Sequence, residues 1–265
     1  MSRKAFTLVE LLVVIAIIAL LMAILMPSLQ RVKKQAQEVT CRSNLRQVGI
    51  AMNTYLHDND FKMPNCYTHT NRSNRYFWYQ TGSGVRVKTP MKPSDDESYW
   101  GTAYWDIVKN TNVFSCPSFI NSAIGVGLDK LYGAPIKEFK DSAFALNGWT
   151  SELSTTSVRM QGEMIIVQEH IEPRIENGRR DMFFEYSGEG PLSHYDPGAG
   201  RALWYRAIFR HGVTRSSDHK TGGRCNVLYL DQHVASLTER EIMEEKKGKP
   251  KWYDPLEKWT DDWDG

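Results

Sequence analysis

The pattern of apolar and polar positions changes twice along this chain. Residues 11–26 carry only apolar side chains, and Glu10 is the one ionisable residue between residues 6 and 29. A helix over residues 6–29 would be about 36 Å long at a rise of about 1.5 Å per residue, which exceeds the roughly 30 Å of a bilayer's hydrocarbon core. This segment is therefore predicted to be a helix that spans a membrane.

From residue 29 onward, apolar side chains recur at steps of three and four with polar residues between them. This spacing predicts that the helix continues to about residue 58, with residues 30–60 as its amphipathic continuation. Such a helix would be about 80 Å long, so we expect one half to lie in the membrane and the other to pack on a globular part. The apolar residues that form this amphipathic pattern are Leu29, Val32, Ala36, Val39, Leu45, Val48, Met52 and Tyr55.

After residue 60 the pattern becomes short segments of period-two alternation between turn-forming residues. This predicts an antiparallel sheet lying on the amphipathic half of the helix, and hence an α+β fold. We assign residues 61–243 to a globular α+β domain and residues 244–265 to a polar tail that contains tryptophan. The expected elements are strands at 76–79, 85–87, 144–146, 164–168, 182–186, 202–209 and 226–237, a short helix at 100–110, and a strand-like pair at 113–114.

The composition of the chain excludes some classes of function. The 33 basic and 31 acidic residues leave a formal net charge of only +2, which predicts no nucleic-acid partner. The mean hydropathy is −0.47 in spite of the apolar segment, so the rest of the chain must face water. That part is also long enough to bury a core.

Glu10 is the unusual residue of the apolar segment. Burying a carboxylate in a membrane helix costs roughly 2.5 to 3.5 kcal/mol on insertion scales, so an acid there indicates a function and a cationic partner. No Lys or Arg lies between Phe6 and Gln30, and the partner is therefore expected to be another chain or a newly made N-terminus. An ordinary signal peptide has a shorter apolar core and would leave Glu10 without a purpose.

These residues resemble the start of type IV pilins and of the pseudopilins of type II secretion. Residues 1–5 match a short basic leader, and the Phe-Thr-Leu-Val-Glu stretch at residues 6–10 matches the start of the family's helix. The resemblance implies cleavage between Ala5 and Phe6 with N-methylation of Phe6. Ala5 departs from the family pattern, in which glycine usually precedes the cut.

The resemblance also implies the place and the partners of the chain. Phe6, Glu10 and Pro27 would act in assembly, and residues 6–29 would cross the bacterial inner membrane once, with the globular domain periplasmic or extracellular. The expected partners are prepilin peptidase, other copies or paralogues of pilin-like subunits, an inner-membrane secretion or pilus assembly platform, and membrane lipid. Both a type II secretion pseudopilus and a type IV pilus-like filament fit.

The four cysteines would then lie in an oxidising compartment. They are Cys41, Cys66, Cys116 and Cys225, and they allow three pairings into two disulfides. We favour Cys41 with Cys116, and buried free thiols are the alternative. No Cys-x-x-Cys pair is present, which argues against a zinc site.

Residues 226–234 resemble in part a C-terminal signature of a large pseudopilin-like branch, namely a histidine, about nine residues and then Asp-Gly-His-Val. Gln232 stands in place of the glycine, and the candidate histidines, His211 and His219, lie 19 and 11 intervening residues before Asp231. Residues 41–47 and 114–118 also resemble this branch. Asp231 and His233 could form a metal or acid–base site that His211 or His219 completes, but we favour a hydrogen-bonded turn.

No established active-site motif occurs in the sequence. We therefore expect no enzymatic activity, no cofactor and no metal. Two alternatives remain open: an anchored exterior domain that binds glycans through some of its eight tryptophans, and a tethered enzyme that uses Asp231 and His233.

Overall fold

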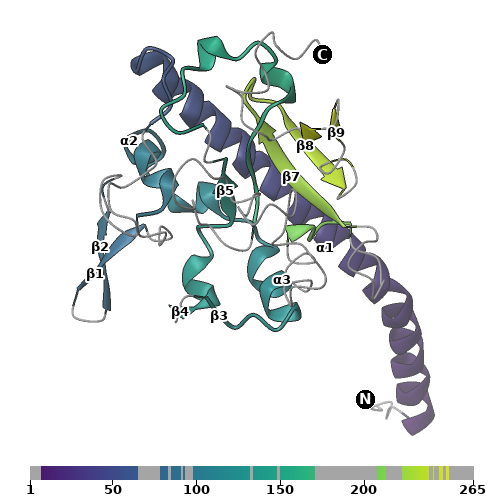
Figure 1. Cartoon of the computed structure of the whole chain (residues 1–265). Helices are drawn as coiled ribbons and strands as arrows, with labels where there is room; N and C mark the ends of the chain where they lie inside the picture. The colour runs from purple at the N-terminus through teal and green to yellow at the C-terminus, as the bar shows by residue number, and fades with distance from the viewer. Residues whose placement is uncertain are drawn as a thin grey trace, which may run out of the picture.

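The computed structural model confirms the α+β fold, in which one long N-terminal helix precedes an antiparallel sheet (Figure 1). The described residues are 7–64, 78–82, 85–90, 92, 98–131, 134–147, 150–170, 208–212, 223–238, 241, 245–246 and 249–250.

Helix α1 runs from Leu8 to Asp58 without interruption and contains Pro27. Thr7 caps its N-terminus, and Asp60 and Phe61, which follow its end, both have positive φ angles of 51° and 56°. Every side chain from residue 7 to residue 36 is exposed, whereas Cys41 is fully buried. Figure 1 shows the consequence, because the N-terminal half of α1 projects alone from the rest of the molecule.

The main sheet has four antiparallel strands in the order β5-β6-β7-β8. The strands are β5 (Phe144–Leu146), β6 (Ile165–Glu169), β7 (Arg224–Tyr229) and β8 (Val234–Thr238). The C-terminal half of α1 packs against β7 and β8, and β5 and β6 are buried along their whole length. The sheet therefore lies on the buried half of the helix.

Short elements surround this pair of layers. They are η1 (Trp100–Tyr104), α2 (Trp105–Val108), η2 (Thr111–Phe114), α3 (Phe119–Gly125), η3 (Ile136–Phe139), η5 (Thr155–Ser157) and η6 (Gln161–Glu163). Three two-stranded ribbons complete the described part: β1 (Tyr79–Gly82) with β2 (Val85–Pro90), β3 (Lys130–Leu131) with β4 (Ala134–Pro135), and β9 (Glu245–Lys246) with β10 (Lys249–Pro250).

An aromatic cluster fills the core between α1, η1 and η2. Trp78 contacts Tyr99 and Phe114 at ring-centroid distances of 5.1 and 4.8 Å, and Trp100 contacts Phe114 at 5.2 Å. All four side chains are buried, and the Trp100 indole donates to the Phe144 carbonyl at 3.0 Å. These tryptophans therefore serve packing, and they do not form a sugar-stacking surface.

The structure changes three of the predicted elements: residues 226–237, the pair 113–114, and the described end of the predicted strand at 202–209. Residues 226–237 are predicted as one strand but form the hairpin β7–β8, because residues 230–233 turn and Gln232 takes a φ of 75°. The pair 113–114 lies in the 3₁₀ helix η2. Ile208 and Phe209 are outside any strand, and the predicted strand at 182–186 lies outside the described residues, as do residues 202–207.

Candidate functional site

Glu10 lies in the first turn of α1 and takes part in a capping box with Thr7. Its Oε2 accepts hydrogen bonds from the Thr7 backbone N–H at 2.8 Å and from the Thr7 hydroxyl at 2.7 Å. The Glu10 backbone N–H donates in return to Thr7 Oγ1 at 3.2 Å. No cationic side chain pairs with Glu10 among the residues that the structure describes. The carboxylate is therefore held at the start of the helix, where it can meet a cation from outside the chain.

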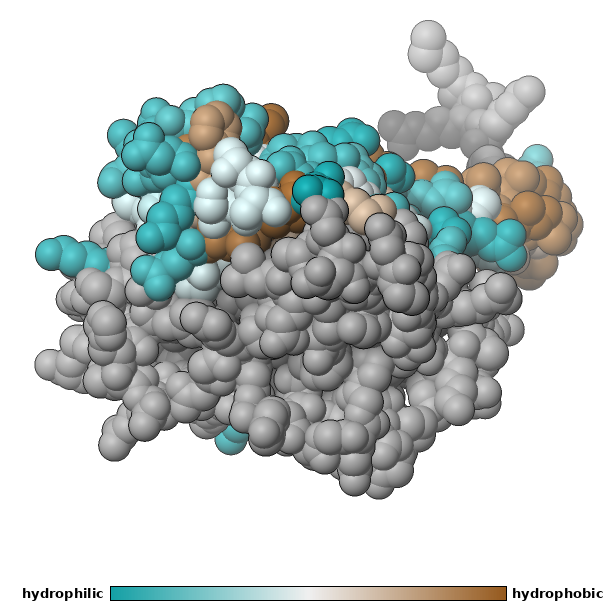
Figure 2. All heavy atoms as spheres, turned by 45° about the horizontal axis from the view of Figure 1, so that its top comes forward, coloured by the Kyte–Doolittle hydropathy of each residue, from teal (hydrophilic) through white to brown (hydrophobic). Residues whose placement is uncertain are grey.

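The exposed half of α1 is a continuous apolar surface. Helix α1 is long and apolar enough to cross a membrane, and the most apolar part of it buries nothing within the molecule. Leu8, Leu20 and Ile24 are exposed by 64 to 77%. Figure 2 shows apolar residues, coloured brown, gathered on this projecting end of the molecule. An apolar surface of this size needs lipid or other protein around it.

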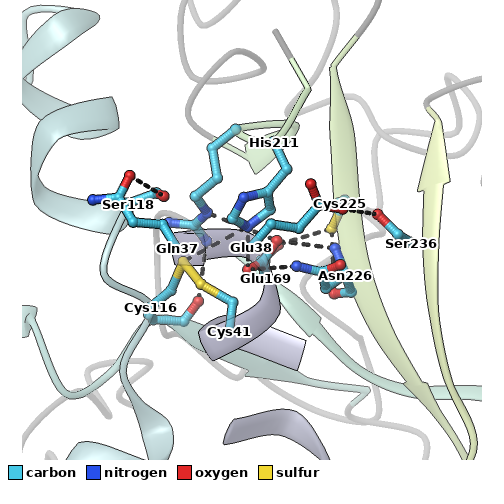
Figure 3. Close-up of polar contacts among 12 residues, drawn as sticks. Gln37, Glu38, Cys41, Cys116, Ser118, Glu169, His211, Cys225, Asn226 and Ser236 are labelled. Carbon is cyan, nitrogen blue, oxygen red and sulfur yellow. Dashed lines mark hydrogen bonds and ion pairs between the residues drawn. A yellow bond between two sulfur atoms is a disulfide. The ribbon is translucent and has the colours of Figure 1, made fainter. Parts of the chain in front are cut away.

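A group of cysteine, carboxylate and imidazole side chains lies buried where α1 meets the sheet (Figure 3). Cys41 comes from α1 and Cys116 from the segment between η2 and α3, and a disulfide joins them. Glu169 ends β6, and His211 forms an isolated bridge with Arg224. The His211 Nε2 atom lies 2.8 Å from Glu169 Oε1 and 3.8 Å from Cys116 Sγ. We call Cys41, Cys116, Glu169 and His211 the buried cluster.

Glu169 is the most heavily hydrogen-bonded member of the buried cluster. Asn226 donates to it twice, from its backbone N–H at 2.9 Å and from its side-chain amide at 3.2 Å, and Arg210 Nε lies 3.9 Å from its Oε2. Burial opposes the charged form, but the charges of His211 and Arg210 and the hydrogen bonds outweigh it and lower the pKa of Glu169. Glu169 is therefore an ionised carboxylate in the interior.

Arg210 is a buried counter-ion of Glu169. Its side chain is fully buried, and its Nη2 donates to the backbone carbonyls of Ala143 at 3.3 Å and His170 at 3.1 Å. The guanidinium also lies 5.3 Å from the centroid of the Phe119 ring. These contacts fix the positive charge in place, so it depends on Glu169 for its compensation.

Replacing Glu169 by alanine is expected to lower the free energy of unfolding by about 3 to 5 kcal/mol, because the buried charge of Arg210 loses its partner. Chemical denaturation of the full chain in detergent, followed by tryptophan fluorescence, measures the change. Asp129→Ala is the control, since Asp129 is exposed and its loss should change stability by less than about 0.5 kcal/mol. Equal stabilities of the two variants would contradict the role given to Glu169.

Cys225 is a free, buried thiol next to this group. Its Sγ donates to the Glu169 backbone carbonyl at 3.4 Å. Burial raises the pKa of Cys225 well above its ordinary value, so it stays a protonated thiol. Cys66, the other candidate for a second disulfide, lies outside the described residues.

Asp231 and His233 lie at the turn between β7 and β8. His233 Nδ1 is 2.6 Å from Asp231 Oδ1, the His233 backbone N–H donates to the same oxygen at 3.1 Å, and the imidazole stacks on Tyr229 at 4.0 Å. Both side chains are nearly half exposed. His211, one candidate for a third member, is instead buried beside Glu169, and His219 lies outside the described residues. The pair therefore stabilises a tight turn.

Comparison with known proteins agrees with the geometry of α1. Residues 1–26 match a family model described as the prokaryotic N-terminal methylation motif. The chain is also 34% identical over 65 residues to the ComG operon protein 3 homolog of Bacillus licheniformis. The matched segment makes up 24% of this chain and 67% of that protein. The chain belongs to the type IV pilin and pseudopilin family. No solved structure matches it.

Sequence reasoning about this pilin-like chain missed the buried cluster. The sequence predicted Cys41 and Cys116 as a pair, but it gave no role to Glu169, and it offered His211 only for the C-terminal signature and as a possible third member of a site with Asp231 and His233. One signal was present, because Glu169 is a charged residue two positions after the apolar run at residues 164–167 and is separated from it only by Gln168. A carboxylate at the end of a buried strand requires a partner.

Proposed function

We propose that this chain is a pilin-like subunit that prepilin peptidase cleaves between Ala5 and Phe6 and methylates at the Phe6 amine. The subunit then assembles through its N-terminal helix into a type II secretion pseudopilus or a type IV pilus-like filament. The observation that carries the proposal is the exposed apolar half of α1, which starts within the matched methylation motif and bears one carboxylate, Glu10.

The mechanism rests on charge pairing between neighbouring subunits. In the low dielectric of packed helices, the Glu10 carboxylate would pair with the Phe6 ammonium of the next subunit and so set the register of assembly. Small residues at 16, 19 and 23 allow helices to approach closely, and Pro27 loosens the helix where the subunit leaves the membrane.

Each segment of the chain then has its own role. Residues 1–5 are the leader, residues 6–29 the membrane and assembly segment, and residues 30–60 the part of the helix that carries the domain. Residues 61–243 form the domain outside the inner membrane, followed by the tail at 244–265. The partners are prepilin peptidase, other pilin-like subunits, the inner-membrane assembly platform and membrane lipid.

Mass spectrometry of the exported protein tests the processing step. We expect the wild-type chain to lack residues 1–5 and to carry the mass of one added methyl group on Phe6. Ala5→Gly should be processed equally well, whereas Ala5→Leu should accumulate uncleaved, because the cut requires a small residue before it. Wild-type protein that retains Met1 after export would contradict cleavage.

A further inference from the structure

The buried cluster contains the donor set that a zinc ion prefers. Two cysteine sulfurs, one imidazole nitrogen and one carboxylate oxygen are the ligand types of tetrahedral zinc sites. These four atoms lie within 4.8 Å of one another, and all four residues are buried. Bond lengths of about 2.0 to 2.3 Å place the donors of a zinc site about 3.3 to 3.8 Å apart. Only small movements therefore separate the present arrangement from a zinc site, once the sulfurs are no longer bonded to each other.

The charges around the buried cluster are those that a buried zinc ion needs. A divalent ion bound by two thiolates and the Glu169 carboxylate carries one net negative charge. Arg210, whose Nε lies 3.9 Å from Glu169 Oε2, supplies the compensating positive charge. An uncompensated charge in the interior is costly, so this neutrality favours the occupied site.

The surroundings of Glu169 hold it as a metal ligand would be held. Both of its oxygens accept hydrogen bonds from Asn226, at 2.9 and 3.2 Å. Ligating carboxylates are ordinarily oriented by such outer contacts. Cys225 lies on the other side of this residue and points its Sγ at the Glu169 backbone carbonyl, so it is a neighbour of the cluster and not a fifth ligand.

We propose that the dithiol form of Cys41 and Cys116 binds one zinc ion together with Glu169 and His211. Forming this site takes two steps. A dithiol reductant gives two electrons and two protons to the disulfide and becomes a disulfide itself. Zinc then replaces the two thiol protons and the proton that His211 Nε2 holds toward Glu169 Oε1, and these protons pass to solvent. The same position thus holds either a disulfide or a metal, and both link α1 to the rest of the domain.

Metal analysis of the full chain in detergent tests the proposal. Protein stripped of metal is divided into a reduced and an oxidised sample, each is incubated with zinc and desalted, and bound zinc is counted by mass spectrometry. We expect one zinc per chain in the reduced sample and none in the oxidised one. Cobalt added to the reduced sample should give thiolate-to-metal absorption and the visible bands of tetrahedral coordination. A reduced, folded sample that retains no zinc would overturn the proposal.

Two variants test whether His211 is a zinc ligand and whether the neighbouring Cys225 is not. His211→Gln should weaken zinc binding by at least 10- to 100-fold, the size of effect already seen for outer contacts of metal sites. Cys225→Ser is the matched control and should still bind one zinc, because Cys225 is equally buried but not a ligand. Equal zinc binding by the two variants would contradict the ligand set.

A measurement on the unchanged chain covers the case in which His211→Gln does not fold. Zinc should slow the alkylation of Cys41 and Cys116 in the reduced protein by at least tenfold, as read from the modified peptides. The alkylation of Cys225 serves as the internal reference and should not respond to zinc in the folded protein. Equal rates for Cys41 and Cys116 with and without zinc would reject the site.

Discussion

Replacing Glu10 by glutamine is expected to abolish filaments while leaving a subunit that is cleaved and inserted in the membrane. Glutamine can still form a capping box with Thr7, so the helix start is kept and only the negative charge is lost. Breaking a charge pair in a low-dielectric environment costs about 3 to 5 kcal/mol, which lowers association by about 100-fold or more. Electron microscopy of filaments and crosslinking between neighbouring subunits measure the loss.

Thr7→Val separates the two roles that Glu10 could have. This variant removes the hydroxyl that bonds to Glu10 but leaves the carboxylate. Loss of an N-cap costs about 1 kcal/mol, so filaments should still form. If Thr7→Val loses its filaments and Glu10→Gln keeps them, Glu10 is only a capping residue, and the assembly role is rejected.

Replacing both Cys41 and Cys116 by serine is expected to lower the free energy of unfolding by about 4.5 kcal/mol in oxidising, metal-free buffer. The two cysteines are 75 residues apart, and closing a loop of that length restricts the unfolded chain by about this amount on the chain-entropy model. Since whole domains are stable by only about 5 to 15 kcal/mol, the domain would lose a large part of its stability. Chemical denaturation of the full chain in detergent measures it.

Reductant provides the control for this prediction. In the presence of a chelator, a reductant should destabilise the wild type and Cys225→Ser but leave the double variant unchanged, because only the first two contain the disulfide. A wild type whose denaturation midpoint does not respond to reductant would contradict the contribution given to the disulfide.

The long helix could be predicted from the sequence because its signal is local. A repeat of three and four residues requires only neighbouring turns of one helix, and it extends from the apolar segment to Tyr55. The strands β5 and β6 were found for the same reason, with β6 beginning at Ile165, one residue later than expected. The fold class followed from these elements, and the structure confirms it.

The hairpin β7–β8 was missed because its turn lacks the residue that usually marks one. Gln232 has a φ of 75°, in the left-handed region where glycine is favoured. The resembling signature has glycine at this position, and glycine there would have signalled the turn. With glutamine in its place, the alternation of residues 226–237 continued without a visible break.

The buried cluster could not be predicted because its four residues come from four separate segments. Only the tertiary fold brings residues 41, 116, 169 and 211 together, and no spacing within any one element reports it. The lack of a Cys-x-x-Cys pair disfavours only zinc sites whose ligands are close together in the sequence. The favoured pairing of Cys41 with Cys116 is present in the structure, but the neighbours of that pair depend on where β6 and β7 lie.

The position of Cys41 has a mechanical consequence. Every side chain from residue 7 to residue 36 is exposed. Along the described part of the helix, Gln37 and Glu38 are the first residues with hydrogen bonds to the domain, which they accept from the hydroxyls of Ser118 and Ser236, and Cys41 follows one turn later. A pulling force on the exposed half of α1 would begin to separate the domain from the helix at this point. The disulfide between Cys41 and Cys116 resists this separation, so a force on the exposed half of α1 moves helix and domain together as one body.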